Sequence, residues 1–348
     1  MTAVDPHPAS DPERPPGAEQ QPGSEPSPDP GAPAAAPRSR RRRVVDVARY
    51  VLLVAVLVAV AVTLWRNWDE VSEELRQLSW GTVALSFLVG LLPPAFTMLG
   101  WRTLLADLGT RLALPPAASV FLVGQLGKYL PGSVWSVVVQ TEMGHRLHVP
   151  RRQMAVAGVI MLGLSVLGGA VVGVPAVPLL LAGRSTVSPW WVVGAVALAL
   201  VALWPPLINA LVGRALRLLR RELLDHELSG GAVVRCMAWI VGAWVGSGVS
   251  VWVLARPLAP DAGLGPLLYV TICGYALASV LGMLAVVLPA GLGLRDAVLG
   301  IGLATLMTPA AAAAVVVVAR FLAVVVDVVV AGAAWLWARR HHLVGSLA

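Results

Sequence analysis

Residues 309–337 form one long apolar run that holds only two charged side chains, Arg320 and Asp327. About 20 mainly apolar residues are enough for an α-helix to span the hydrocarbon core of a bilayer. Comparable apolar runs lie at 44–65, 82–105, 153–182, 190–212 and 236–255. Only 13% of the residues are charged, whereas charged residues make up about a quarter of an ordinary water-soluble domain. The sequence therefore predicts an all-α polytopic membrane protein.

Charged segments between the runs predict how the chain is oriented. Arginine-rich segments lie at 38–43, 145–152, 213–221 and 339–340, each next to an apolar run. Residues 66–77, in contrast, carry four acids and two arginines. Arginine and lysine near membrane spans stay on the cytoplasmic side. We therefore expect both termini to be cytoplasmic. The chain has 25 arginines and one lysine, which fits a bacterial source and the bacterial cytoplasmic membrane.

Two further apolar lengths, at 117–141 and 283–303, are interrupted by helix-breaking residues. The breaks read "GKYLPG" and "LPAGLG", and their helix-break residues are Gly127, Pro131, Gly132, Pro289, Gly291 and Gly293. Irregular backbone at membrane depth is tolerated only inside the protein or beside a water-filled cavity. Full crossing by 117–141 would place the basic segment 145–152 outside, so we interpret both lengths as re-entrant.

This interpretation gives six full spans and two re-entrant broken helical segments. Three full spans separate the two breaks, so the second segment enters from the opposite face. Such an arrangement is typical of an inverted-repeat helical bundle, in which the broken segments meet near the midplane and form the substrate site.

The ends of the chain differ from its membrane part. Residues 1–43 are rich in Pro, Gly, Ala and acids, and cannot bury enough apolar surface to fold. We predict that they form a disordered cytoplasmic tail and not a signal peptide. The predicted domains are this tail, a transmembrane domain at 44–338 and a short cytoplasmic tail at 339–348.

Three cations near the breaks are the candidate substrate-binding residues. Lys128 flanks the first break, Arg295 follows the second, and Arg320 lies in the last span. Charged side chains inside a membrane are costly, and they usually mark a functional site. Gln125 joins this set because it lies three residues before Lys128, so the two would share one helix face. Such a site would suit an anionic group, with phosphate the natural choice. Lys128 could instead extend to the inner interface.

Asp296 and Asp327 are candidates for proton or ion coupling. Asp296 lies at the start of a predicted half-helix, where it could equally cap free backbone N–H groups. Asp327 lies about two turns after Arg320, which is too far for an ideal direct contact. We therefore expect Arg320 and Asp327 each to have a partner on another helix, in either a functional or a structural role.

Motifs of the common enzyme classes are missing from the sequence. It contains no Asp-Xaa-Asp, no His-Glu-Xaa-Xaa-His, no Gly-Xaa-Ser-Xaa-Gly and no phosphate-binding Walker loop. We expect no catalytic residues, no metal site, no cofactor and no nucleic-acid partner. The expected partners are membrane lipids with an anionic headgroup and, as an alternative, cell-envelope biosynthetic proteins. The sequence does not predict an oligomeric state.

Three segments give the chain a family resemblance. "VFLVGQLGKYLPGSVW", the later "VLPAGLGLRDAVL" and the final "RFLAVVVD" resemble the membrane region of lysylphosphatidylglycerol synthases, and more closely the stand-alone flippase-like proteins that share it. The resemblance covers roughly residues 44–338. It implies inverted repeats and re-entrant helices around a lipid-accessible cavity. Relatives often have Glu after Gly-Xaa-Arg, where this chain has Asp296.

The resemblance also implies a function. In the full-length synthases this region moves an aminoacylated phospholipid across the bilayer, and a C-terminal domain transfers lysine from a charged transfer RNA. We expect this chain to lack the transferase. The leading hypothesis is translocation of an anionic lipid or lipid-linked precursor across the cytoplasmic membrane. The alternatives are a non-transporting partner that recruits cell-envelope enzymes and, less favoured, a lipid-phosphate transferase. Deleting residues 1–43 should inactivate a recruiter but not a translocator.

Overall fold

The computed structural model describes Val62, Trp65, 68–129, 135–180, 189–218, Arg220, 226–285 and 293–341. These residues form helices and connecting turns, with no strand among them. The predicted tail 1–43, nearly all of the predicted span 44–65 and the end of the C-terminal tail, 342–348, lie outside the described residues. So do four of the six predicted helix-break residues: Pro131, Gly132, Pro289 and Gly291.

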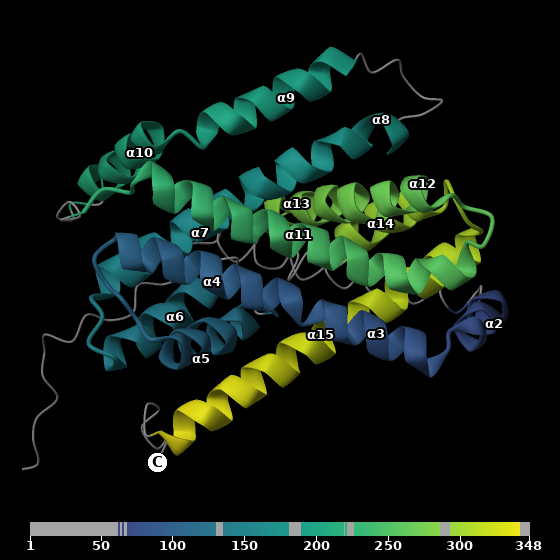
Figure 1. Cartoon of the computed structure of the whole chain (residues 1–348), viewed down its shortest axis with the longest axis horizontal. Coiled ribbons are helices and arrows are strands. Elements are labelled where there is room, and N and C mark those ends of the chain that lie inside the picture. Colours follow the sequence, from purple (N-terminus) through teal and green to yellow (C-terminus); the bar gives the residue numbers. More distant parts are fainter. Residues whose placement is uncertain are drawn as a thin grey trace, which may run out of the picture. The chain divides into compact units, whose positions relative to one another are not determined.

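The first half of the described chain runs from α2 to α8. Its elements are α2 (Trp68–Gln77), α3 (Trp80–Gly90), α4 (Leu92–Asp107), α5 (Leu114–Gln125), the 3₁₀ turn η1 (Leu126–Tyr129), α6 (Trp135–Arg146), α7 (Arg151–Gly173), the 3₁₀ turn η2 (Val174–Ala176) and α8 (Val177–Leu180). Figure 1 shows these helices in blue and teal.

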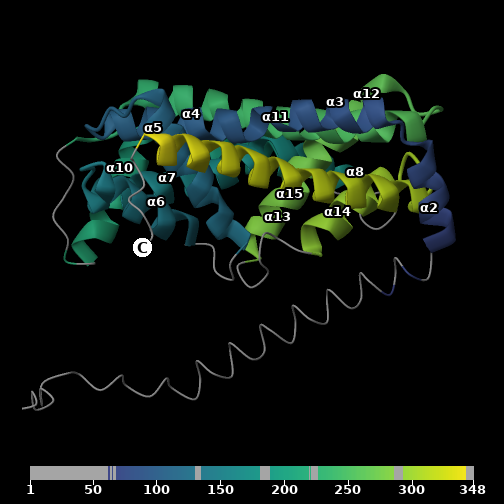
Figure 2. The same ribbon diagram turned by 90° about the horizontal axis from the view of Figure 1, so that it is seen from below.

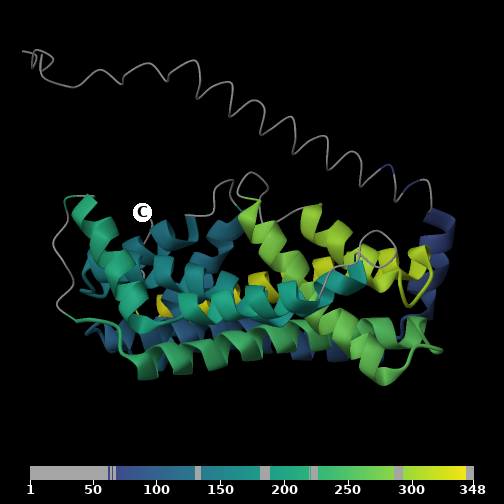
Figure 3. The same ribbon diagram turned by 90° about the horizontal axis from the view of Figure 1, so that it is seen from above.

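The second half runs from α9 to α15. Its elements are α9 (Pro189–Ala202), α10 (Pro205–Leu218), α11 (Gly230–Leu258), α12 (Leu264–Tyr269), the π-helical turn η3 (Val270–Gly274), α13 (Tyr275–Leu284), α14 (Leu294–Leu303) and α15 (Pro309–Arg340). The long helix α15 is seen plainly in the view from below (Figure 2), and the long helix α11 in the view from above (Figure 3).

Five helical stretches of the described chain are long and apolar enough to cross a membrane. They are Trp80–Asp107, Arg151–Ala176, Gly230–Leu258, Leu264–Leu284 and Pro309–Arg340. Four of them match the predicted spans at 82–105, 153–182, 236–255 and 309–337. Together with the family match reported below, they support a multi-pass membrane protein, as predicted.

The predicted count of six full spans is not confirmed. The predicted span 190–212 falls on two helices, Trp190–Ala202 and Pro205–Leu218, which are bent by 64° at the break between them. Pro205 and Pro206 begin the second helix, and prolines are common at a helix start because they lack a backbone N–H. Residues 264–284 also differ from expectation, because this length before the second break could itself cross a membrane. The inverted repeat stays a prediction.

Close helix packing holds the described chain together at small residues. A Cβ added at Gly248 of α11 would lie 2.4 Å from Ile272 Cα, and one at Gly173 of α7 would lie 2.4 Å from the backbone N of Leu277. Small side chains let two backbones approach this closely. The resulting van der Waals packing stabilises helix association in lipid, where the hydrophobic effect does not act between helices. Gly248 lies in the stretch "GAWVGSG" at 242–248, which is rich in small residues.

Hydroxyl groups add polar contacts between distant helices. Ser86 of α3 donates to the Ser250 backbone carbonyl of α11 at 2.9 Å, and Ser119 of α5 donates to the Ala334 carbonyl of α15 at 3.1 Å. Each of these bonds gives a serine hydroxyl a hydrogen-bond partner, which the hydrocarbon of a bilayer cannot provide. Through the second contact, α5 is fixed on the C-terminal half of α15.

Candidate functional site

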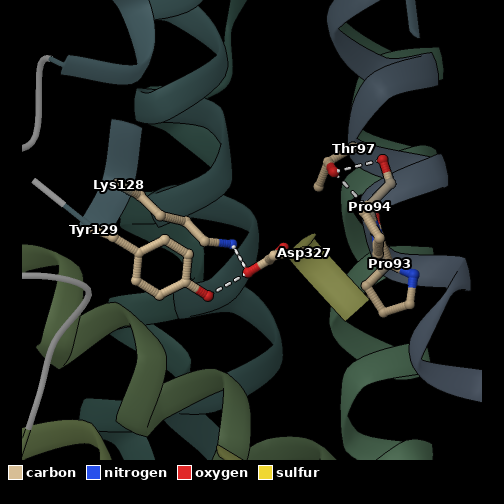
Figure 4. A network of polar contacts seen from close by, with 6 residues as sticks. All are labelled: Pro93, Pro94, Thr97, Lys128, Tyr129 and Asp327. Atoms are coloured by element: carbon tan, nitrogen blue, oxygen red, sulfur yellow. Dashed lines mark hydrogen bonds and ion pairs between the residues drawn. The ribbon is translucent and has the colours of Figure 1, made fainter. Parts of the chain in front are cut away.

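Two side chains beside the first break meet the acid of the last helix. Lys128 Nζ lies 2.6 Å from Asp327 Oδ2, and the Tyr129 hydroxyl donates to the same oxygen at 2.5 Å. Figure 4 shows Lys128 and Tyr129 reaching from η1 toward Asp327 on α15. The Asp327 side chain is only 11% exposed, and that of Lys128 is 39% exposed. The carboxylate is therefore buried with two donors, while the ammonium remains partly accessible.

Gly127 allows η1 to occupy this position. A Cβ added there would lie 2.6 Å from the backbone N of Ser136 and 2.8 Å from its Cα. The backbones of η1 and α6, the two sides of the break, therefore approach too closely for any side chain. The α-helical pattern ends at Gln125 and tightens to a 3₁₀ turn over Leu126–Tyr129, which brings Lys128 and Tyr129 to α15.

Both charges of α15 lie near its middle. At 1.5 Å per residue, Asp327 is about 4 Å and Arg320 about 7 Å from the midpoint of the helix axis. The helix extends over Pro309–Arg340, far longer than a bilayer core requires. If α15 crosses a membrane, both charges are at membrane depth. There an unpaired charge would be costly, so each is expected to be paired.

Arg320 faces the second break. Its NH1 lies 3.9 Å from Asp296 Oδ1, and both side chains are less than a fifth exposed. The other oxygen of Asp296 accepts a hydrogen bond from Gly293 N at 3.2 Å. Asp296 therefore caps α14, as one of its two predicted roles required, and it also contacts the cation of α15. Gly293 has φ 84° and ψ −55°, a conformation that L side chains rarely adopt.

Arg295 stacks on an aromatic ring next to this pair. Its guanidinium carbon lies 4.7 Å from the centre of the Tyr275 ring, a cation–π contact between α14 and α13. Its Nε is buried and has no hydrogen-bond partner in the structure. A buried donor without a partner costs free energy and marks a place where an acceptor would be favourable.

The structure thus brings five of the predicted site residues to α15 or to the ends of the broken helices. We call Lys128, Arg295, Asp296, Arg320 and Asp327 the central cluster. The prediction that Arg320 and Asp327 each have a partner on another segment is confirmed.

Gln125 does not join these contacts. It ends α5, and it makes no hydrogen bond or ion pair with the central cluster within the described chain. The change from α-helix to 3₁₀ turn after Gln125 alters the spacing on which its predicted common face with Lys128 depended.

A third helix interruption lies beside Asp327. The span Trp80–Asp107 is divided at Leu91, and a Cβ added at Gly90 would lie 3.4 Å from Val326 Cγ2. Thr97 donates its hydroxyl toward the carbonyls of Pro93 and Pro94, at 2.9 and 3.1 Å (Figure 4). Hydroxyl groups of this kind stabilise carbonyls at proline breaks in membrane helices.

Two tyrosines of the site were missed by sequence reasoning. Tyr129 and Tyr275 belong to only four tyrosines in the chain. Tyr129 follows Lys128 directly inside an apolar segment, and that placement was a signal for a second polar donor. Tyr275 carries no such signal, because its partner Arg295 lies beyond the second break.

The described residues contain no group of three or more His, Cys, Asp or Glu side chains placed to hold a metal ion. The polar chemistry of the site is that of paired charges, the Tyr129 hydroxyl and the cation–π contact of Arg295 with Tyr275.

Comparison with known proteins identifies the family of the chain. A family model described as "Lysylphosphatidylglycerol synthase TM region" matches residues 51–331. The chain belongs to this family. The match includes both broken segments and every residue of the central cluster. No curated protein matches the chain. Membership of the family indicates a role connected with membrane lipids.

Proposed function

We propose that the protein translocates an anionic lipid or a lipid-linked precursor across the cytoplasmic membrane. The observation that carries the proposal is the meeting of both broken segments with α15 through paired charges, Lys128 with Asp327 and Arg320 with Asp296. Broken helices that meet in this way are a common construction of transporter substrate sites.

The net positive charge of the central cluster favours a lipid with an anionic headgroup. Three cations and two acids make up the central cluster, so it carries one excess positive charge when all five groups are ionised. Arg295 supplies a guanidinium that no acid of the described chain pairs with, and its Nε is buried without an acceptor. Guanidinium groups bind phosphate through parallel hydrogen bonds. A lipid phosphate is therefore the favoured ligand.

In this proposal the headgroup exchanges places with the acids. A phosphate that enters the cluster competes with Asp327 for Lys128 and with Asp296 for Arg320. The partly exposed Lys128 is the first cation that it can reach. Each acid released from its cation would favour a proton or a coupling ion, which gives Asp296 and Asp327 their role. The lipid tails stay in the bilayer throughout, and no covalent bond is formed or broken.

The finer topology belongs to the same proposal. Six full spans, two re-entrant segments of inverted orientation and cytoplasmic termini would give the central cluster access from either leaflet in turn. This topology is supported by the interrupted helices at η1 and before α14, and by the basic segments that end the predicted spans.

Lipid scrambling in proteoliposomes tests the proposal. The purified chain would be reconstituted with fluorescent phosphatidylglycerol or phosphatidylcholine, and the outer-leaflet probe would be bleached over time. Translocation predicts protein-dependent loss of the phosphatidylglycerol signal beyond half. A signal that stays at half, for both of these lipids and for a polyprenyl-phosphate probe, would contradict it.

A further inference from the structure

A second basic site lies at the end of α4, in a pocket that shares no residue with the central cluster. The pocket has a volume of about 340 Å³, and three arginines line it: Arg102, Arg111 and Arg235. Asp107 and Thr103 contribute the other polar side chains of the lining. The arginines come from α4, from the turn after it and from α11, so the fold and not the sequence gathers them.

The turn after α4 is shaped to present Arg111. Gly109 has φ 100°, and a Cβ added there would lie 2.7 Å from the His226 ring. The turn therefore needs a glycine both for its backbone conformation and for space. Arg102 Nε donates to the Leu112 carbonyl at 2.8 Å, which ties the far side of the turn to α4.

The single acid of the pocket is already engaged. Asp107 accepts hydrogen bonds from the Ser229 backbone N at 2.7 Å and from the Ser229 hydroxyl at 2.8 Å. Ser229 in turn caps α11. Neither Arg111 nor Arg235 forms an ion pair with a carboxylate of the described residues. Three arginines against one acid leave an excess of two positive charges.

We propose that this pocket binds the phosphate group of an anionic phospholipid at the membrane surface. Two candidate spans end here, Trp80–Asp107 with its last turn and Gly230–Leu258 with its first. The pocket therefore lies at the level of the lipid headgroups if those helices cross the membrane. Basic pockets between transmembrane helices on the cytoplasmic side are typical sites for anionic headgroups. Arginine also binds phosphate more specifically than lysine does.

The proposal does not rest on translocation, and its test uses binding. Native mass spectrometry of the detergent-solubilised chain would be titrated with dioctanoyl phosphatidylglycerol, dioctanoyl phosphatidylcholine or inorganic phosphate. We expect saturable binding of phosphatidylglycerol only. The double variant Arg111→Ala, Arg235→Ala should bind it at least tenfold more weakly. Both side chains are exposed, so the variant should fold normally.

Two controls separate the pocket from the rest of the molecule. Arg214→Ala removes an exposed arginine of α10 that does not line the pocket, and it should bind phosphatidylglycerol as the wild type does. All titrations would be repeated with Arg295→Gln, in which the central cluster has lost a cation. The pocket is expected to bind in that background too, and the double variant should weaken this binding at least tenfold.

The assignment is overturned by any of three results. The first is unchanged phosphatidylglycerol binding in the double variant on both backgrounds. The second is equally tight binding of phosphatidylcholine, which would exclude selection by charge. The third is equally tight binding of inorganic phosphate, which would make the pocket a site for free anions.

Discussion

The Lys128 ammonium and the Asp327 carboxylate lie 2.6 Å apart, although 199 positions of the chain separate them. The cation that flanks the first helix break is thereby paired with the acid in the middle of α15. Tyr129 donates to the same carboxylate oxygen. Removal of Lys128 would leave the carboxylate of Asp327 buried without its cation. Removal of Asp327 would leave an ammonium that is partly exposed to solvent, because Lys128 is much less buried than Asp327.

This difference predicts unequal costs for the two single substitutions. Lys128→Met should cost about 2–4 kcal/mol, because it leaves a buried carboxylate without its cation. Asp327→Asn should cost about 1–2 kcal/mol, because the exposed part of Lys128 can be hydrated and Asn still accepts from Tyr129. Denaturation in detergent, followed by tryptophan fluorescence, would measure both.

The double variant Lys128→Met, Asp327→Asn provides the control. Its cost should be smaller than the sum of the single costs by about 1–3 kcal/mol, since contacting residues couple. Additivity within about 0.5 kcal/mol would mean that the two groups do not interact.

Gly127→Ala should destabilise the chain because η1 and α6 are in backbone contact. The added Cβ would lie 2.6 Å from Ser136 N, and backbone cannot move aside as a side chain can. Overpacking of this kind costs about 1–3 kcal/mol. Gly163→Ala in α7 is the matched control, because nothing lies within 4 Å of its added Cβ. Thermal midpoints measured in one detergent would compare them, and equal midpoints would refute the close approach.

Gly293→Ala tests the backbone that begins α14. With φ 84°, alanine should be strained there by about 1–3 kcal/mol. Gly300→Ala in the same helix meets only ordinary contact at 3.8 Å, and it should be neutral or stabilising. Thermal midpoints of the two variants would decide. If Gly293→Ala were as stable as Gly300→Ala, the start of α14 would not require a residue that adopts positive φ without strain.

Labelling of single cysteines tests the proposed topology. Arg111→Cys and Arg146→Cys flank the first broken segment and should react with a membrane-impermeant maleimide on the same side of intact cells. Asp261→Cys and Ala304→Cys flank the second, and both should react on the opposite side. Cys236 and Cys273 would first be replaced by alanine. Reaction of positions 111 and 146 on opposite sides would make residues 117–141 a full span.

Hydropathy was enough to predict most of the helices and both interruptions. Apolar length indicated the spans, and Pro and Gly indicated the breaks, since each depends on local sequence alone. The bend of 64° between α9 and α10 was not predicted, because one proline pair can either begin a helix or kink one. Residues 264–284 were not predicted as a separate span, because no charged residue separates them from the second break.

Pairing within the site could be predicted only in part. The two-turn separation of Arg320 and Asp327 excluded a direct pair and required other partners. It could not say that the partners are Asp296 and Lys128, because that depends on which helices pack together. Gly127 was predicted as a helix breaker, whereas its structural role is close contact with Ser136. The pocket of Arg102, Arg111 and Arg235 had no sequence signal at all.

Headgroup selection by Arg295 is the most direct test of the central claim. Scrambling rates for fluorescent phosphatidylglycerol and phosphatidylcholine would be measured in proteoliposomes with the wild type, Arg295→Gln and the exposed control Arg76→Gln. A hydrogen bond to a charged group is worth about 1.5–3 kcal/mol. Arg295→Gln should therefore lower the scrambling rate of phosphatidylglycerol about ten- to hundredfold, and Arg76→Gln should leave that rate unchanged. Equal phosphatidylglycerol rates in all three proteins would contradict the account.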